Sequence, residues 1–147
     1  MSFQRRSFGR TFGDRIITTP RGFVSHVRTK NGHIVAKLTW YPNFGPKTTE
    51  KFNRAQAFVD SEVLRLSEPY TPLRTGTLVK TGILGTEIGS GWVRWIAPYA
   101  RRQYYLKRRT GSATGPLRGP MWFERMKTAH KDEILRGAAK LTGGKPK

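Results

Sequence analysis

Two long segments of the chain carry apolar residues at a helical spacing. In residues 48–67 these recur every three or four positions and therefore share one helix face: Phe52, Ala55, Val59, Val63 and Leu66. Thr48 or Thr49 can cap this helix, and Pro69 ends it. A second stripe predicts a helix over 120–141, with Pro120 in its first turn, and we expect Gly137 to favour fraying at its end: Phe123, Met126, His130, Ile134, Ala138 and Leu141.

Other segments are rich in β-branched and aromatic residues and predict strands. The runs 23–28 and 33–40 flank an Asn31-Gly32 pair, which predicts a hairpin over 22–40 because both turn positions favour positive φ. Residues 78–97 predict a second antiparallel pair around the turn 89–91. Within it, Gly82 and Gly85 indicate a bulge or the close approach of another backbone.

The elements expected are thus two amphipathic helices and two antiparallel strand pairs. The 147 residues and their hydrophobic fraction of 36% allow one modest core, so we expect a single domain over 22–141. A basic arm over 1–21, a flexible Gly-rich loop over 107–119 and a basic tail over 142–147 complete the organisation. Nine residues are expected in the core: Phe52, Val59, Val63, Leu66, Trp95, Trp122, Phe123, Met126 and Ile134.

The formal net charge of +19 is the strongest signal in the composition. It is concentrated in residues 1–47, which hold nine Lys or Arg against one acid, and in 101–118, which hold six and no acid. A polyanionic neighbour would account for these clusters, whether nucleic acid, an acidic protein surface or anionic lipid. A simply solvated surface is the alternative.

Candidate catalytic and metal-binding groups are sparse. The chain has no cysteine, and His26 and His33 lack a third ligand, so we expect no metal and no cofactor. Ser25 beside His26 lacks the third member of a triad, and Asp132 and Glu133 point in different directions on a helix. We therefore expect no enzymatic activity. No window approaches 18 consecutive apolar residues, which predicts a soluble protein made and used without export.

Four short motifs occur in a recognisable order over roughly residues 50–141. They are Glu68-Pro69-Tyr70-Thr71-Pro72 after a helix, Thr75-Gly76-Thr77-Leu78, Ala97-Pro98-Tyr99-Ala100-Arg101 with Tyr104-Tyr105, and Trp122-Phe123-Glu124-Arg125-Met126-Lys127. In order and spacing the chain resembles the minor capsid proteins of tailed bacteriophages and the wider group of head–tail joining, or tail-completion, neck proteins.

The resemblance implies a small α+β domain in which two amphipathic helices pack on an antiparallel sheet. It also implies a non-enzymatic virion protein, made in the host cytoplasm, that forms a homo-oligomeric ring at the head–tail interface. A hexamer or dodecamer would contact connector or stopper proteins and tail-tube proteins, with packaged DNA passing non-specifically through its lumen and no membrane partner. Subunit or partner contacts are expected at Tyr70, Thr75, Gly76, Tyr99, Arg101, Tyr104 and Tyr105, although Tyr99 and one of the adjacent pair could instead fill the core. Residues expected to face DNA or a partner are Arg5, Arg6, Arg10, Arg15, Arg102, Lys107, Arg108, Arg109 and Arg118.

A stand-alone nucleic-acid-binding protein is the alternative function. Arginines interleave with aromatic residues in two segments, where they could neutralise phosphates while the rings stack on bases: Phe3, Arg5, Phe8 and Arg10, then Arg101, Tyr104, Tyr105 and Arg108. No recognition helix is predicted, so such binding would be independent of base sequence.

Overall fold

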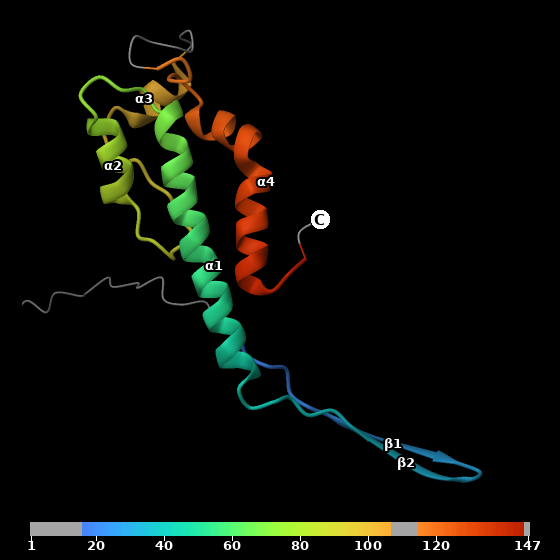
Figure 1. Ribbon diagram of the computed structural model, residues 1–147. Coiled ribbons are helices and arrows are strands. Elements are labelled where there is room, and N and C mark those ends of the chain that lie inside the picture. The colour runs from blue at the N-terminus through green and yellow to red at the C-terminus, as the bar shows by residue number, and fades with distance from the viewer. Residues whose placement is uncertain (1–15, 107–114, 146–147) are drawn as a thin grey trace, which may run out of the picture.

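The computed structural model describes residues 16–106 and 115–145 and confirms an α+β fold (Figure 1). The elements in chain order are β1 (Val24–Thr29), β2 (Gly32–Lys37), α1 (Phe44–Ser67), the 3-10 turn η1 (Glu68–Tyr70), α2 (Thr77–Gly85), α3 (Ala100–Tyr105) and α4 (Trp122–Thr142). The predicted arm lies mostly outside the described residues, as do the first eight residues of the predicted loop and the last two of the tail.

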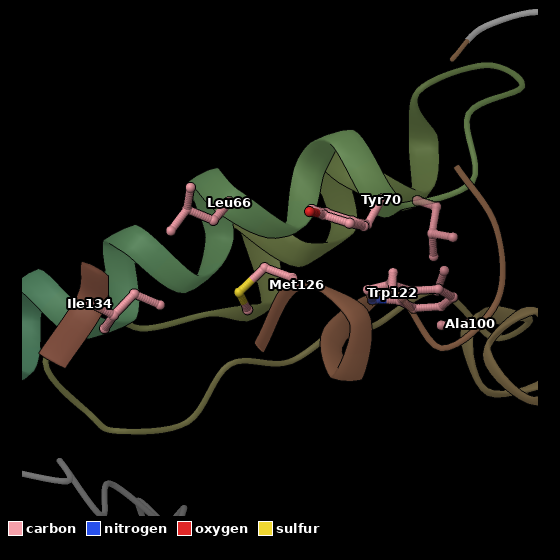
Figure 2. Close-up of a cluster of buried hydrophobic side chains, with 8 residues drawn as sticks. Leu66, Tyr70, Ala100, Trp122, Met126 and Ile134 are labelled. Atoms are coloured by element: carbon pink, nitrogen blue, oxygen red, sulfur yellow. The ribbon is translucent and has the colours of Figure 1, made fainter. Parts of the chain in front are cut away.

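The core forms where α4 packs alongside α1 and where the corner around η1 closes one end of the pair (Figure 2). Its buried members are Leu66, Tyr70, Leu78, Ala97, Ala100, Trp122, Met126 and Ile134, and Val59, Val63, Trp95, Tyr104 and Phe123 pack against them. Phe52 was expected in this core but is 49% exposed. The first turns of α1 extend past the end of α4, so α4 does not cover that part of the stripe (Figure 1).

The hairpin is confirmed, but its turn differs from the prediction. Thr29 pairs with Gly32, so Lys30 and Asn31 form the loop. Among the described residues Met121 is the one non-glycine residue with positive φ, so Asn31 does not adopt the expected left-handed conformation. The helices also do not pack on the sheet as expected. They bury their apolar stripes against each other, and the hairpin projects beyond the first turn of α1 (Figure 1).

The predicted strand pair over 78–97 is wrong. Its first half is the helix α2, and residues 92–97 run past α2 without entering a sheet. The two glycines explain this packing: a Cβ at Gly82 would lie 2.7 Å from Trp95 Nε1, and one at Gly85 would lie 2.6 Å from the Arg94 carbonyl oxygen. The expected close approach is present, but it occurs on a helix and without a bulge.

Both long helices lie near their predicted positions, with shifted ends. α1 begins at Phe44, and Pro46 fits its first turn because the N–H groups there have no helical partner. Neither predicted threonine serves as the N-cap, since Asn43 occupies that position and Thr49 Oγ1 instead accepts a hydrogen bond from Ile17 N at 2.9 Å. Gly137, which was expected to fray α4, allows close packing, because a Cβ there would overlap the Phe58 ring.

Candidate interaction site

A cleft of about 720 Å³ lies between the turn before α2, the helix α3 and the segment before α4. Residues 72–78 form one wall, Tyr99, Gln103 and Leu106 form another, and residues 118–120 complete it. Three predicted interface residues, Thr75, Gly76 and Tyr99, line this cleft. The structure therefore brings together positions that lie more than twenty residues apart in the sequence.

The wall before α2 has a defined backbone conformation. Gly76 is the N-cap of α2 with φ +77°, a left-handed conformation that disfavours any side chain. Its carbonyl accepts a hydrogen bond from Lys80 N at 3.0 Å, while the hydroxyls of Thr75 and Thr77 lie 2.8 Å apart across it. These contacts fix the rim of the cleft and leave Thr75 exposed.

Arg118 anchors the segment opposite this rim. Its guanidinium donates to the carbonyl oxygens of Glu68 at 3.1 Å and Thr71 at 2.8 Å, and Gly119 N donates to the carbonyl of Tyr70 at 3.0 Å. The Arg118 side chain, which was expected to face DNA or a partner, thus bonds to backbone carbonyl oxygens at the corner after α1 and lines the cleft. Other hydrogen bonds also fix this last part of the predicted flexible loop: Arg118 N donates to the carbonyl of Gly115 and Gly119 N to that of Tyr70.

Arg125, on the first turn of α4, reinforces the same corner. It donates to the carbonyl oxygens of Pro120 at 3.0 Å, Leu117 at 2.6 Å and Tyr70 at 3.2 Å. The guanidinium carbon also lies 5.4 Å from the centre of the Tyr70 ring, in a cation–π contact. The sequence motif that contains Arg125 thus forms part of the scaffold that shapes the cleft.

Two of the tyrosines predicted at interfaces belong to the core. Tyr70 is 8% exposed, and its hydroxyl lies 3.3 Å from Nε2 of His130, at the edge of the core where that histidine was expected. Tyr104 packs edge-on against Trp122 with ring centres 4.7 Å apart. Burial raises the pKa of the Tyr104 phenol. Tyr70 is therefore buried in the core, and Tyr104 is partly buried against it.

The other tyrosines and arginines of this region form an exposed ridge. Tyr99 is 42% exposed and Tyr105 is 67% exposed, and Arg101 and Arg102 are both exposed on the helix between them. We call these four residues the α3 ridge. The other predicted basic residues lie outside the described residues: Arg5, Arg6, Arg10, Arg15, Lys107, Arg108 and Arg109.

Asp60 is a key buried residue that the sequence analysis did not identify. It is 2% exposed, and its Oδ2 accepts hydrogen bonds from Gly89 N at 2.8 Å and Gly91 N at 3.0 Å. Gln56 Nε2 donates to Oδ1 at 2.8 Å. This carboxylate fixes the turn after α2 against α1. The one available signal was an acid immediately after Val59 in the apolar stripe of the helix.

The hairpin is a second candidate surface. Almost every one of its side chains is exposed, including the apolar side chains of Val27 and Ile34. His26 and His33 stack across the strands, with Nδ1 of the first 3.3 Å from Nε2 of the second. In the part of the chain that the structure describes, no three His, Asp or Glu side chains are grouped closely enough to hold a metal ion.

Comparisons with protein-family models, with curated proteins and with solved structures find no match to this chain. Among the described residues, none of the helices combines the length and apolar character needed to span a bilayer.

Proposed function

We propose that this chain is a non-enzymatic structural subunit of a bacteriophage neck, forming a ring that joins the head connector to the tail and through which DNA passes. The observation that carries the proposal is the projecting hairpin. It exposes its apolar side chains, and none of its residues belongs to the hydrophobic core that the described residues form. An apolar element of this kind gains free energy when another protein surface covers it. The resemblance of the motif order to that of neck proteins is the reason for proposing this assembly.

The net charge supports a polyanionic environment for that ring. A hexamer would carry six times +19, or about +114, so its subunits repel one another unless anions lie nearby. Packaged DNA in the lumen would supply them, and release of its counterions makes Lys and Arg contacts favourable without reading base sequence. The α3 ridge is one described surface that offers such contacts.

Measurement of mass by light scattering tests this proposal. We expect a monomer at low salt, and larger species when short duplex DNA or high salt reduces the repulsion between copies. DNA binding itself should be weak and should disappear at moderate salt. A chain that stays monomeric under all these conditions would refute the ring.

A stand-alone nucleic-acid-binding protein is the second candidate, favoured by the exposed rings and guanidinium groups of the α3 ridge. In this function Tyr105 and Tyr99 would stack on bases while the arginines contact phosphates. Neutralising Arg101 and Arg102 together should then weaken single-strand binding far more than neutralising Lys131 and Lys140, which are exposed on α4. Equal effects of the two double variants in fluorescence anisotropy would mean that total charge alone drives binding.

A further inference from the structure

The two faces of the hairpin differ sharply in chemistry. Directly paired residues of antiparallel strands point to the same face, so the register assigns every side chain to one face or the other. One face, here called the apolar ribbon face, carries no charge: Phe23, Ser25, Val27 and Thr29 opposite Gly32, Ile34, Ala36 and Leu38. The other face carries two cations and two histidines among its six residues: Val24, His26, Arg28, His33, Val35 and Lys37.

The large side chains of the apolar ribbon face are open to solvent. Phe23 is 61% exposed, Ile34 is 60% exposed, and Val27 and Leu38 are about half exposed. Alternation of this kind normally places the apolar side of a sheet on a core. Here the chain's own core lies alongside α1, and the hairpin projects away from it (Figure 1).

A second exposed apolar surface occurs on α2. The inner side of this helix contacts the core through Leu78 and meets Trp95 at Gly82, whereas Ile83 is 61% exposed and Leu84 is 77% exposed. Ile88, in the turn that follows, is 47% exposed. We call these three residues the α2 patch.

The two surfaces lie at opposite ends of an elongated molecule. The hairpin starts beyond the first residue of α1, whereas α2 lies beside the last part of that helix (Figure 1). The 24-residue helix α1, about 36 Å long, thus separates the hairpin from the α2 patch of its own copy. Contact between the two surfaces is therefore possible between different copies, in a head-to-tail arrangement.

Charge also favours the apolar ribbon face as the docking element. A chain of net charge +19 can approach a second copy most easily through faces that carry no cations. The apolar ribbon face meets this requirement along its whole length, while Arg28 and Lys37 point away from it on the opposite face.

We infer that the apolar ribbon face of one copy docks on the α2 patch of the next copy. The inference rests on the proposed function in that it supplies the contact between ring subunits. The ribbon face measures about 20 by 10 Å, which is below the roughly 800 Å² per partner of a stable pairwise interface. A single contact is therefore weak, and copies accumulate only when several such contacts close together.

Charge substitutions on the two faces of one strand test the inference. Ile34→Glu places a carboxylate on the apolar ribbon face, and Val35→Glu places the same group on the opposite face, at a site 52% exposed against 60%. At high salt, which screens the repulsion between copies, I34E should reduce self-association about tenfold or more while V35E leaves it unchanged. On the receiving side, Leu84→Glu should act like I34E, and Leu135→Glu, at an exposed leucine of α4, should not.

Cross-linking identifies the partner surface directly, because the chain has no cysteine of its own. We expect a mixture of I34C and isotope-labelled L84C to give a mixed dimer with a short bis-maleimide. Its yield should be severalfold above that of V35C with L84C, or of I34C with L135C. Equal yields in all mixtures, or a dominant I34C homodimer, would overturn the inference.

Failure of this contact can be distinguished from failure of the proposed ring. If I34E and the unmodified chain form oligomers equally well, the proposed hairpin contact is refuted and the proposed ring is not. Absence of oligomers from the unmodified chain, with DNA and at high salt, would refute both. Unchanged circular dichroism of each variant would show that the fold is retained, as expected for exposed positions.

Discussion

Replacement of Asp60 by alanine should destabilise the fold through a defined set of hydrogen bonds. The carboxylate is 2% exposed and accepts from two backbone N–H groups, of Gly89 and Gly91, and from the side-chain amide of Gln56. Removing the acceptor leaves these donors unpaired, at about 1–3 kcal/mol for a buried donor. The two glycines are exposed, so water partly replaces the carboxylate, and we expect a total loss of about 2–4 kcal/mol.

Asparagine at the same position separates the hydrogen bonds from the charge. Asp60→Asn keeps one acceptor oxygen for both backbone N–H groups, and the amide of Gln56 can turn to accept from the new NH₂ group. We expect D60N to cost about 1 kcal/mol, because bonds to an ionised acceptor are about twice as strong as neutral ones. Asp132→Ala, at an exposed position of α4, is the control and should change stability by less than about 0.5 kcal/mol.

Urea unfolding followed by tryptophan fluorescence measures these differences, since Trp95 and Trp122 contact each other in the core region. If D60A were as mild as D132A, the turn at residues 89–91 would not depend on this carboxylate. If D60N were as damaging as D60A, the loss would come from the charge itself and the hydrogen-bond argument would be refuted.

Two further predictions concern the packing of helices and of one phenol. Gly137→Ala should destabilise by about 1–2 kcal/mol in urea unfolding, because overlap with the Phe58 ring outweighs the gain of about 1 kcal/mol in helix propensity, and adding Phe58→Leu should recover part of the loss. Failure of the double variant to recover would show that the ring is not the obstacle. Burial raises the pKa of Tyr104 above about 10, so its contribution to stability is complete below about pH 10 and is lost as the pH rises through the folded-state pKa. Tyr104→Phe should therefore lose less stability between about pH 9 and about pH 11 than the unmodified chain, and identical alkaline losses in unfolding experiments would contradict this assignment.

The two long helices and the hairpin could be predicted because their signals are local. The stripes of α1 and α4 repeat over several turns, and the β-prone runs around Lys30 and Asn31 leave few other conformations. The segment 77–85 could not be assigned in the same way, since a short apolar run fits a strand and a helix equally well. Contacts with Trp95 and Arg94 accompany the helix there, and these residues are distant in sequence.

Side-chain exposure within the candidate site was the least predictable property. Tyr70 is buried and Tyr104 packs against Trp122, whereas Tyr99 and Tyr105 are exposed. All four are tyrosines, so residue type could not distinguish the two pairs. The cleft itself could be anticipated in part, since Thr75 and Gly76 were identified from the motif order and do line it. The role of Arg118 depends on the carbonyl oxygens of Glu68 and Thr71, about fifty residues away in the sequence, which come within its reach only once the chain has turned after α1.

The two-stranded sheet has a consequence for the solubility of the protein. Because β1 and β2 pair only with each other among the described strands, each leaves one edge whose N–H and C=O groups can pair with a strand of another molecule. Cations along the hairpin oppose such edge-to-edge association, as lysine does on many natural sheet edges. Salt screens this protection, so concentrated protein should be handled at low ionic strength until a partner or DNA is added.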